Sequence, residues 1–187
     1  MHMQIRAFTV DEYHHLGELG IFGPEERLEL LDGQILVMPP PSPAHSSTVL
    51  RLAHELIVRL GRRALVLCQD EVDLSKFSAP MPDIAILRRR DDYYRHAHPQ
   101  PQDIYALIEV ARSSLKYDSG RKLLAYARAG IAEYWIANLV HSNLTRFTQP
   151  NELGYAESRT FAHGEVVTLC TEPPIEFGVD ELLGPPN

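Results

Sequence analysis

The most regular alternation of hydrophobic and polar positions in the chain follows Ser42 and Pro43. The apolar residues recur every three or four positions up to Gly61, and they are Val49, Leu52, Ala53, Leu56, Ile57 and Leu60. This spacing places them on one face of a helix. Serine is a preferred N-cap, proline is favoured at the first helical position, and glycine commonly closes a helix. The pattern predicts an amphipathic helix with one buried stripe.

Short apolar runs predict the strands of a sheet. Arg27–Met38 contains two such runs around Asp32-Gly33, a pair that is typical of the tight turn of a β-hairpin. Further strands are expected within residues 64–74, over Asp83–Leu87 and over Ile104–Val110. The last two runs are almost entirely apolar, so we expect interior strands that are covered on both faces.

The remaining segments complete the order of elements. Thr9 with Asp11 and Glu12 indicates a helix start, and that helix is expected to end near Leu19. A second helix is expected over Asp118–Ala129, before Gly130. Further strands are expected over Glu133–Ala137, over Leu144–Thr148 and, as edge strands, within Arg159–Leu169. This order predicts an α/β or α+β domain with a mixed sheet flanked by helices.

The composition is that of one folded domain, expected over residues 1–187. The chain is 44% hydrophobic and 23% charged, and 18 Lys and Arg against 25 Asp and Glu give a net charge of -7. This balance excludes a uniformly basic nucleic-acid coat protein but is compatible with a local basic cleft. Cys68 and Cys170 have no metal-ligand spacing, and no stretch approaches the ~20 apolar residues of a bilayer span. We therefore expect a soluble, cytoplasmic protein.

Two carboxylates interrupt the most apolar strands. Asp83 follows Pro82 at the start of one strand, and Glu109 lies near the end of another. A buried carboxylate must pair, bind a metal or become protonated. If the two strands are neighbours, Asp83 and Glu109 could share a divalent cation of the Mg²⁺ type, which prefers oxygen ligands. Each residue also has a simpler interpretation, as a turn former or as a solvent-facing strand end.

A lysine and several arginines follow these strands. Lys122 lies four residues after Asp118, on the same face of the predicted helix. In the simpler interpretation it is a solvated lysine paired with Asp118. However, the surrounding segment carries an excess of basic residues, namely Arg112, Lys116, Arg121, Lys122 and Arg128. In a protein of net negative charge, this local excess indicates a phosphate-facing patch.

Together these residues resemble the PD-(D/E)XK nuclease superfamily. Pro82-Asp83, Glu109-Val110 and Tyr117-Asp118 with Lys122 are most similar to the superfamily's Uma-type putative restriction endonuclease branch. The similarity covers roughly Phe8 to Asn138 and includes Glu29–Gly33, His45 after a proline-rich loop, Tyr126-Ala127 with Gly130, and Glu133-Tyr134-Trp135. The resemblance implies a restriction-endonuclease-like mixed central sheet flanked by helices, with an N-terminal helix and a β-hairpin. The nuclease core is expected at about 27–150, and C-terminal edge strands and a tail at 151–187.

The chain departs from the family pattern at three places. The usual Glu-x-Lys is replaced by Glu109-Val110-Ala111, so that the lysine has to come from the helix as Lys122, as is typical of the branch. Arg112-Ser113-Ser114 stands where Ser-Pro-Ser is frequent, and Asn138 stands where an aspartate is common. These departures remove no core ligand, although the second could alter the loop over the site.

The resemblance implies metal-dependent hydrolysis of phosphodiester bonds in DNA. Asp83 and Glu109 would hold Mg²⁺ or Mn²⁺, with the backbone carbonyl of Val110 as a further ligand. Such a metal polarises the phosphoryl oxygen and lowers the pKa of bound water. Lys122 would orient that water or offset charge on the scissile phosphate.

Two further residues have open roles. Glu29 is either an outer ligand or an exposed strand carboxylate, since it alternates with Leu28 and Leu30. His45 lies in the first turn of the helix after Ser42, where capping or packing is favoured over chemistry.

The partners of the chain are equally open. A nucleic-acid backbone could be bound by Arg88 and Arg89, which stand in a run with Arg90, together with Arg112, Lys116 and Arg121. Alternatively, the arginine run belongs to a solvated loop whose charge is neutralised by Asp91 and Asp92. Tyr93 and Tyr94 could stack on bases or anchor the loop. A homodimer is plausible for an enzyme that cuts both strands, with the strand around Trp135 or the C-terminal strands as its interface.

Two other functions fit the residues less well. A catalytically silent nuclease fold used for binding or regulation is suggested by the acidic charge balance and by the lack of a recognisable target-recognition domain. A glycoside hydrolase could use Asp83 and Glu109 as acid and base, but it would give Lys122 no role.

Overall fold

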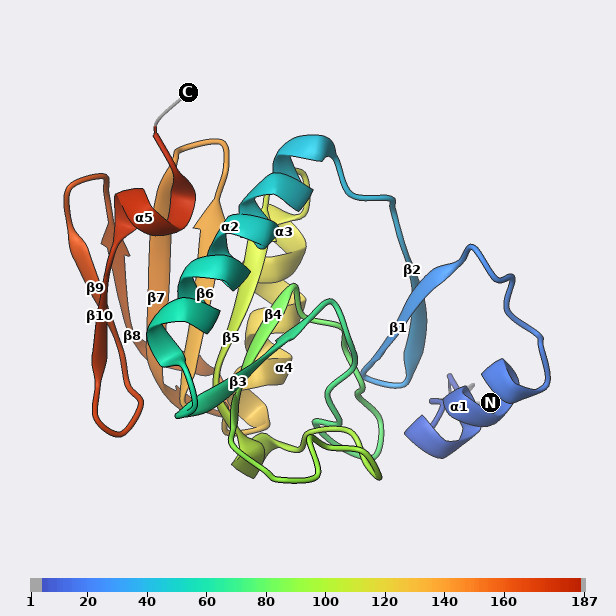
Figure 1. Ribbon diagram of the computed structural model, residues 1–187. Coiled ribbons are helices and arrows are strands. Elements are labelled where there is room, and N and C mark those ends of the chain that lie inside the picture. The colour runs from blue at the N-terminus through green and yellow to red at the C-terminus, as the bar shows by residue number, and fades with distance from the viewer. Residues whose placement is uncertain (1–4, 186–187) are drawn as a thin grey trace.

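The computed structural model describes residues 5–185, and its centre is a six-stranded mixed sheet in the order β3-β4-β5-β6-β7-β8 (Figure 1). Its strands are β3 (Ala64–Cys68), β4 (Ile84–Arg88), β5 (Ile104–Ala111), β6 (Glu133–Asn138), β7 (Asn143–Asn151) and β8 (Gly154–Phe161). β5 and β6 run parallel, and all other neighbours are antiparallel. The prediction of a mixed sheet flanked by helices is confirmed.

Helices and a small second sheet cover the two faces of this sheet. One face carries α2 (Pro43–Leu60), α5 (Val179–Leu183) and the antiparallel pair β9 (Val166–Leu169) and β10 (Ile175–Gly178). The other face carries α3 (Leu115–Tyr117), the π-helical turn η2 (Asp118–Lys122) and α4 (Leu123–Arg128). Figure 1 shows α2 in front of the sheet and α4 behind it. A short 3-10 helix, η1 (Pro101–Asp103), precedes β5.

The N-terminal elements form a separate small core at one side of the sheet. These are α1 (Val10–Glu18) and the hairpin of β1 (Arg27–Leu31) and β2 (Gln34–Met38). They lie to the right of the sheet in Figure 1. β1 reaches the rest of the chain through a bridge between Leu30 and Ala79. Because Ala79 lies just before β4, this bridge brings β1 next to the start of that strand.

The predicted helix boundaries are confirmed for α1 and α2. Thr9 and Glu12 form a reciprocal capping box at the start of α1. The Ser42 hydroxyl accepts a hydrogen bond from the His45 amide, and Gly61 ends α2. The buried residues of α2 follow the predicted stripe, except that Ile57 is 54% exposed. The hairpin turn is also as expected, since Asp32 and Gly33 both have a positive φ, as a type I′ turn requires.

Other predictions need correction. The helix expected from Asp118 already begins at Leu115, and η2 interrupts it, with the Leu123 amide donating to the Asp118 carbonyl. The edge strands expected within Arg159–Leu169 are only partly correct. β8 is an edge strand of the central sheet, but it begins already at Gly154 and only its last residues lie in that range, while β9 leaves the central sheet and pairs with β10. β10 and α5 were not predicted, because their patterns are too short to stand out.

The prediction of interior strands is confirmed for β4 and β5, whose central residues are buried. β6 is buried along its whole length between β5 and β7. The strand around Trp135 therefore has no surface to offer to a second copy of the chain, and that part of the dimer hypothesis is wrong. The last residues of the expected tail, 186–187, lie outside the described part. Among residues 5–185, none of the helices combines the length and the apolar character needed to cross a membrane.

Candidate active site

The pairing of β4 with β5 brings the two predicted carboxylates to the same place. Ile84 lies opposite Ile108 in this antiparallel pair, so the residue before β4 lies beside the last residues of β5. The Val110 amide donates a hydrogen bond of 2.9 Å to Asp83 Oδ2. Asp83 and Glu109 therefore converge at one end of two neighbouring strands, although they are far apart in the sequence.

Glu109 points towards the face covered by η2 and α4. Side chains alternate along a strand, so Glu109 lies on the same side as Leu107 and Ala111, which pack in the cluster containing Tyr126. Glu109 Oε1 accepts hydrogen bonds from Lys122 Nζ at 2.9 Å and from the Tyr126 hydroxyl at 2.6 Å. Lys122 and Glu109 therefore lie close together, as expected. The interpretation of Lys122 as a solvated lysine is wrong, since its side chain is 0% exposed.

The wide turn η2 places two charged residues in the interior. Asp118 and Lys122 are both buried, and they lie at the two ends of this turn. Asp118 accepts a hydrogen bond of 2.6 Å from the Ser114 hydroxyl, and its backbone carbonyl accepts one from Tyr134. π-helical turns are rare in proteins, but those that occur often lie at functional sites.

Glu29 is a second partner of the lysine. It comes from β1 and is 0% exposed, with its Oε2 lying 3.1 Å from Lys122 Nζ. It also accepts hydrogen bonds from the Tyr117 hydroxyl at 2.6 Å and from the Met81 amide at 3.2 Å. The alternative of an exposed strand carboxylate is therefore wrong. Period-two alternation failed here because consecutive residues of β1, Leu28 to Leu31, are all buried, so that both faces of this strand are covered.

His45 has a polar partner at the site. Its Nε2 lies 3.0 Å from Asp83 Oδ2, while its backbone amide takes part in the cap of α2. The histidine thus combines the predicted place in the first helical turn with a contact to a site carboxylate. Gln69, which the sequence did not single out, donates to the other oxygen of Asp83 at 3.3 Å.

The electrostatics of the site are dominated by buried carboxylates. Burial raises the pKa of Glu109 well above its usual range; Lys122 opposes this shift, and repulsion from Asp83 and Asp118 adds to it. Burial likewise raises the pKa of Asp118 to about 6. For Asp83 the effect of burial is outweighed by the contacts with His45 and the Val110 amide, which lower its pKa. The site therefore gathers more negative charge than its cations offset.

Lys122 remains charged in this environment. Burial alone would lower the pKa of its ammonium group, but Glu109 and Glu29 raise that pKa above its ordinary value. Its Nζ contacts Glu109, Glu29 and the Met81 carbonyl, the last at 3.3 Å. The contacts with Glu109 and the Met81 carbonyl are hydrogen bonds, and the contact with Glu29 is an ion pair.

A cavity of about 460 Å³ opens onto the site. Its lining consists of Arg27, Met38, Pro39, Pro40, Pro41, Ser42, His45, Asp83, Glu109, Arg112, Ser113, Ser114 and Asp118. Asp83 and Glu109 thus face a space that solvent can enter, whereas Lys122 lies behind Glu109. The proline-rich loop forms one wall, and the loop after β5 forms the other.

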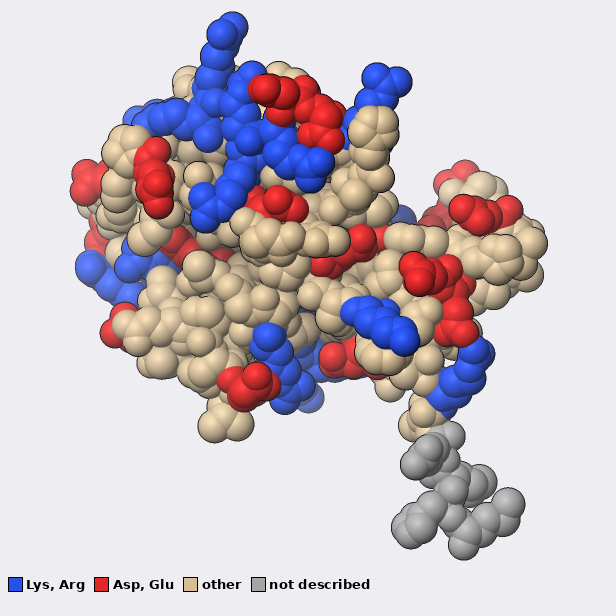
Figure 2. Space-filling view, turned by 90° about the horizontal axis from the view of Figure 1, so that it is seen from below, with Lys and Arg blue, Asp and Glu red and all other residues tan. Residues whose placement is uncertain are grey.

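The predicted basic residues divide into two groups. Arg112 lines the cavity, and Lys116 and Arg121 are exposed on α3 and η2. Arg88 and Arg89 are not brought to the site, because Arg88 ends β4 and Arg89 follows it, whereas Asp83 lies just before the start of that strand. Figure 2, which views the molecule from below, shows the largest group of Lys and Arg at the upper left of this face, with Asp and Glu beside it.

The loop after β4 is internally neutralised. Arg89 and Arg90 form ion pairs with Asp91 and Asp92, and Arg90 also lies over the ring of Tyr94. This pairing agrees with the interpretation of a charge-balanced loop.

Comparison with known proteins identifies relatives of this architecture. A family model described as "Uma2: Putative restriction endonuclease" matches residues 10–180. Among solved structures, the fold is similar to that of "a putative nuclease belonging to DUF820" from Anabaena variabilis ATCC 29413, with a TM-score of 0.69 and 15% sequence identity over 94% of this chain and 97% of that chain. At this identity the likeness shows the fold alone. No curated protein matches the chain.

Proposed function

This chain belongs to the Uma2 family of putative restriction endonucleases, and on that premise we propose that it is a metal-dependent endonuclease that hydrolyses phosphodiester bonds in DNA. The observation that carries the proposal is the convergence of Asp83 and Glu109 at the ends of β4 and β5, with Lys122 Nζ 2.9 Å from Glu109. The three residues come from separate elements and meet beside a cavity.

The donor set fits a hard divalent cation. Mg²⁺ is usually bound by one or two carboxylates, with water and substrate phosphate completing its shell. Asp83 and Glu109 supply two carboxylates at the cavity wall, and the Val110 carbonyl is the further ligand that we propose. Burial, with repulsion from Asp83 and Asp118, raises the pKa of Glu109, and a cation in the cavity would offset the charge of these carboxylates. We propose Mg²⁺ or Mn²⁺, which when bound would polarise the phosphate and make bound water more acidic.

The remaining side chains position this pair. Lys122 orients the Glu109 carboxylate and supplies positive charge behind it, which offsets charge developing on a phosphate in the cavity. Its contact with the Met81 carbonyl is its longest, at 3.3 Å, and is the one most readily exchanged for a water or phosphate oxygen. Tyr126 fixes the same carboxylate oxygen, and Glu29 holds the lysine from the other side.

We propose that DNA enters along the cavity beside Arg112 and Arg27. Both arginines line this cavity and carry the charge that attracts a phosphate backbone. Lys116 and Arg121 extend the basic surface on α3 and η2. A homodimer stays a prediction, and sedimentation of the full chain would measure it.

The test is a cleavage assay with the metal-stripped full chain. Supercoiled plasmid is incubated with protein and Mg²⁺ or Mn²⁺, and nicked and linear products are quantified. Asp83→Asn and Glu109→Gln should each lower the rate by about 10²-fold or more, as expected for the loss of a group that stabilises developing charge. The matched control is Asp91→Asn, an exposed aspartate on the loop after β4, which should cleave like the unsubstituted chain.

Calorimetry with Mg²⁺ separates the outcomes. Metal binding that is lost in Asp83→Asn supports the proposal. Unchanged cleavage in Asp83→Asn would place the active site elsewhere. Absence of Mg²⁺ and Mn²⁺ binding, even with DNA present, would favour a silent nuclease fold used for binding or regulation.

A further inference from the structure

A second group of metal-ligating side chains lies outside the candidate active site. His14, Glu71 and His98 each offer one ligand atom, and these atoms all lie within 4.8 Å of one another. The residues come from α1, from the connection between β3 and β4, and from the loop before η1. We propose that this cluster is a binding site for Zn²⁺.

The geometry is close to that of a metal centre. His14 Nε2 lies 2.5 Å and His98 Nε2 lies 3.8 Å from Glu71 Oε1. In a tetrahedral zinc site with bonds of about 2.0–2.2 Å, ligand atoms are about 3.3–3.6 Å apart. The two observed distances bracket this value, so small rotations of the imidazole rings suffice to admit the ion.

The type of donor selects the metal. Two neutral imidazole nitrogens and one carboxylate oxygen form a set that suits Zn²⁺, whereas Mg²⁺ prefers oxygen ligands alone. Three protein ligands also leave a fourth position for water. The cluster therefore differs in chemistry from the Asp83 and Glu109 pair and should bind zinc in the presence of excess Mg²⁺.

The surroundings hold the three segments together independently of a metal. The Val10 amide donates to the Lys76 carbonyl and the Asp73 amide donates to the Pro99 carbonyl, at 2.9 and 2.8 Å. These bonds fix α1 and the loop of His98 against the connection that carries Glu71. The cluster is thus largely preformed, which lowers the entropic cost of binding an ion.

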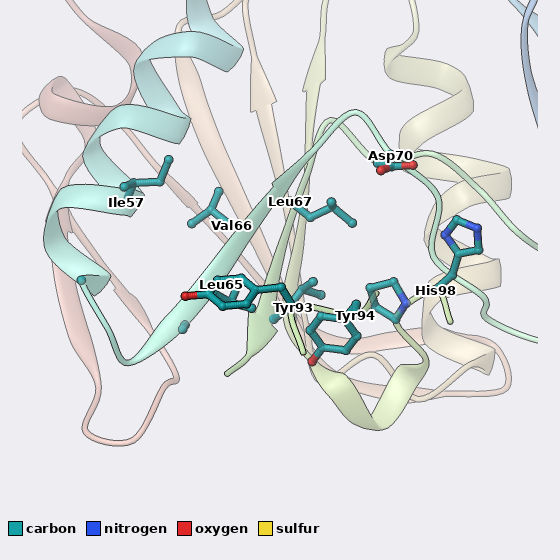
Figure 3. Close-up of a pocket in the computed structure, with 12 residues that line it drawn as sticks. Ile57, Leu65, Val66, Leu67, Asp70, Tyr93, Tyr94 and His98 are labelled. Atoms are coloured by element: carbon teal, nitrogen blue, oxygen red, sulfur yellow. The ribbon is translucent and has the colours of Figure 1, made fainter. Parts of the chain in front are cut away.

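The site combines a buried anchor with accessible ligands. The Glu71 side chain is 11% exposed, while His14 and His98 are 37% and 44% exposed, so an ion can enter from solvent. Figure 3 shows His98 at one end of the cavity that Tyr93 and Tyr94 also line. Asp73 Oδ1, two residues from Glu71, is buried and has no hydrogen-bond partner in the described part of the chain. A cation at the cluster would compensate both carboxylates.

A bound ion would join α1 to two loops that are distant in sequence. The Glu71 segment continues through Ala79, which bridges to β1, into Asp83 at the active site. Zinc would therefore stabilise the N-terminal elements against the connection that leads to the active site.

The experiment is a zinc titration of the metal-stripped full chain by calorimetry, with excess Mg²⁺ present. Cys68→Ser/Cys170→Ser serves as the background, because both cysteines are exposed thiols that could bind zinc. We expect one saturable site in this background. Zinc at about 100 times its Kd should raise the Tm by about 5–10 °C, since a ligand that binds the folded state stabilises it by mass action.

Two ligand variants and two matched controls decide the outcome. His14→Gln and His98→Gln should each weaken zinc binding by at least about tenfold, and at the same zinc concentration the Tm shift should fall to about half or less. His15→Gln and His96→Gln change exposed histidines next to the same segments and should bind within about twofold of the background. The inclusion of His98→Gln, on an exposed loop, keeps the test valid if His14→Gln disturbs α1.

Other results would overturn the proposal. Equal zinc affinity in the ligand variants and the controls would show that the cluster is a hydrogen-bonded triad without a metal function. Zinc binding that disappears in Asp83→Asn instead would assign the ion to the active site, as would its displacement by Mg²⁺.

Discussion

Replacement of Lys122 by methionine tests how the buried charges of the candidate active site are balanced. Lys122→Met keeps a long, flexible side chain but removes the ammonium group that pairs with Glu29 and Glu109 at 3.1 and 2.9 Å. Both carboxylates are almost completely buried, at 0% and 3% exposure. Removal of one partner from a buried ion pair leaves an uncompensated charge and typically costs about 3–5 kcal/mol.

The expected loss is large enough to measure by unfolding. In a domain of this size, 1 kcal/mol corresponds to about 2–4 °C in Tm, so Lys122→Met should unfold about 6–20 °C lower. Urea unfolding can be followed by fluorescence, because the single tryptophan, Trp135, is 0% exposed. The measurement is made in EDTA, so that no divalent cation replaces the lysine charge.

Two further variants define the cause of this loss. Lys116→Met makes the same change at an exposed lysine of α3 and should cost less than about 1 kcal/mol. Lys122→Met/Glu29→Gln/Glu109→Gln removes the carboxylate charges together with the lysine, and it should recover much of the lost stability. A loss in Lys122→Met as small as that in Lys116→Met would refute the reasoning, as would a triple variant no more stable than Lys122→Met.

Two local features allow simpler predictions, each checked by thermal unfolding. Gly33→Ala should lower the free energy of unfolding by about 1–3 kcal/mol, which is more than Gly20→Ala should. Both glycines have a positive φ, but a Cβ at Gly33 would lie 2.4 Å from the Ala7 Cβ, whereas a Cβ at Gly20 would meet nothing within 4 Å. Equal losses would show that the contact with Ala7 relaxes. Ser42→Ala should cost about 0.5–2 kcal/mol through loss of the α2 cap, whereas Ser47→Ala, at an exposed helical position, should change little; no difference between them would contradict the capping role.

The proposed site also explains why several of its residues had ambiguous patterns. The alternation of Glu29 with Leu28 and Leu30 suggests a solvent-facing position for Glu29 in its strand, yet in the structure Glu29 is buried against Tyr117 and Lys122. Local alternation reports on one face of a strand, and it contains no information about a segment that later covers the other face. Conflicts between local pattern and burial are common at functional sites.

Tyr126 of the candidate active site shows the same limit. Tyr126 appeared in the sequence as part of a family signature, with no role attached, and in the structure its hydroxyl donates to Glu109 at 2.6 Å. This hydrogen bond joins a helix to a strand 17 positions earlier in the chain, so no pattern of neighbouring residues predicts it. Tyrosine is also common in cores, so its presence alone does not distinguish the two roles.

The sequence by itself determined the local elements of this protein. The stripe of α2, the Asp32-Gly33 turn and the apolar runs of β4 and β5 follow from side-chain spacing and from the backbone preferences of Ser, Pro and Gly, which act within a few residues. The two carboxylates on apolar strands were visible for the same reason, because a charge in a hydrophobic run stands out.

The tertiary structure decided which of these residues meet. The antiparallel register of β4 and β5 sets Asp83 beside Val110, and the turn η2 carries Lys122 to Glu109. The β1 bridge and the packing of α1 bring Glu29 and His14 to partners more than fifty residues away. Such contacts depend on register, on the faces that pack together and on loop geometry, all of which are fixed by the summed burial of the whole chain.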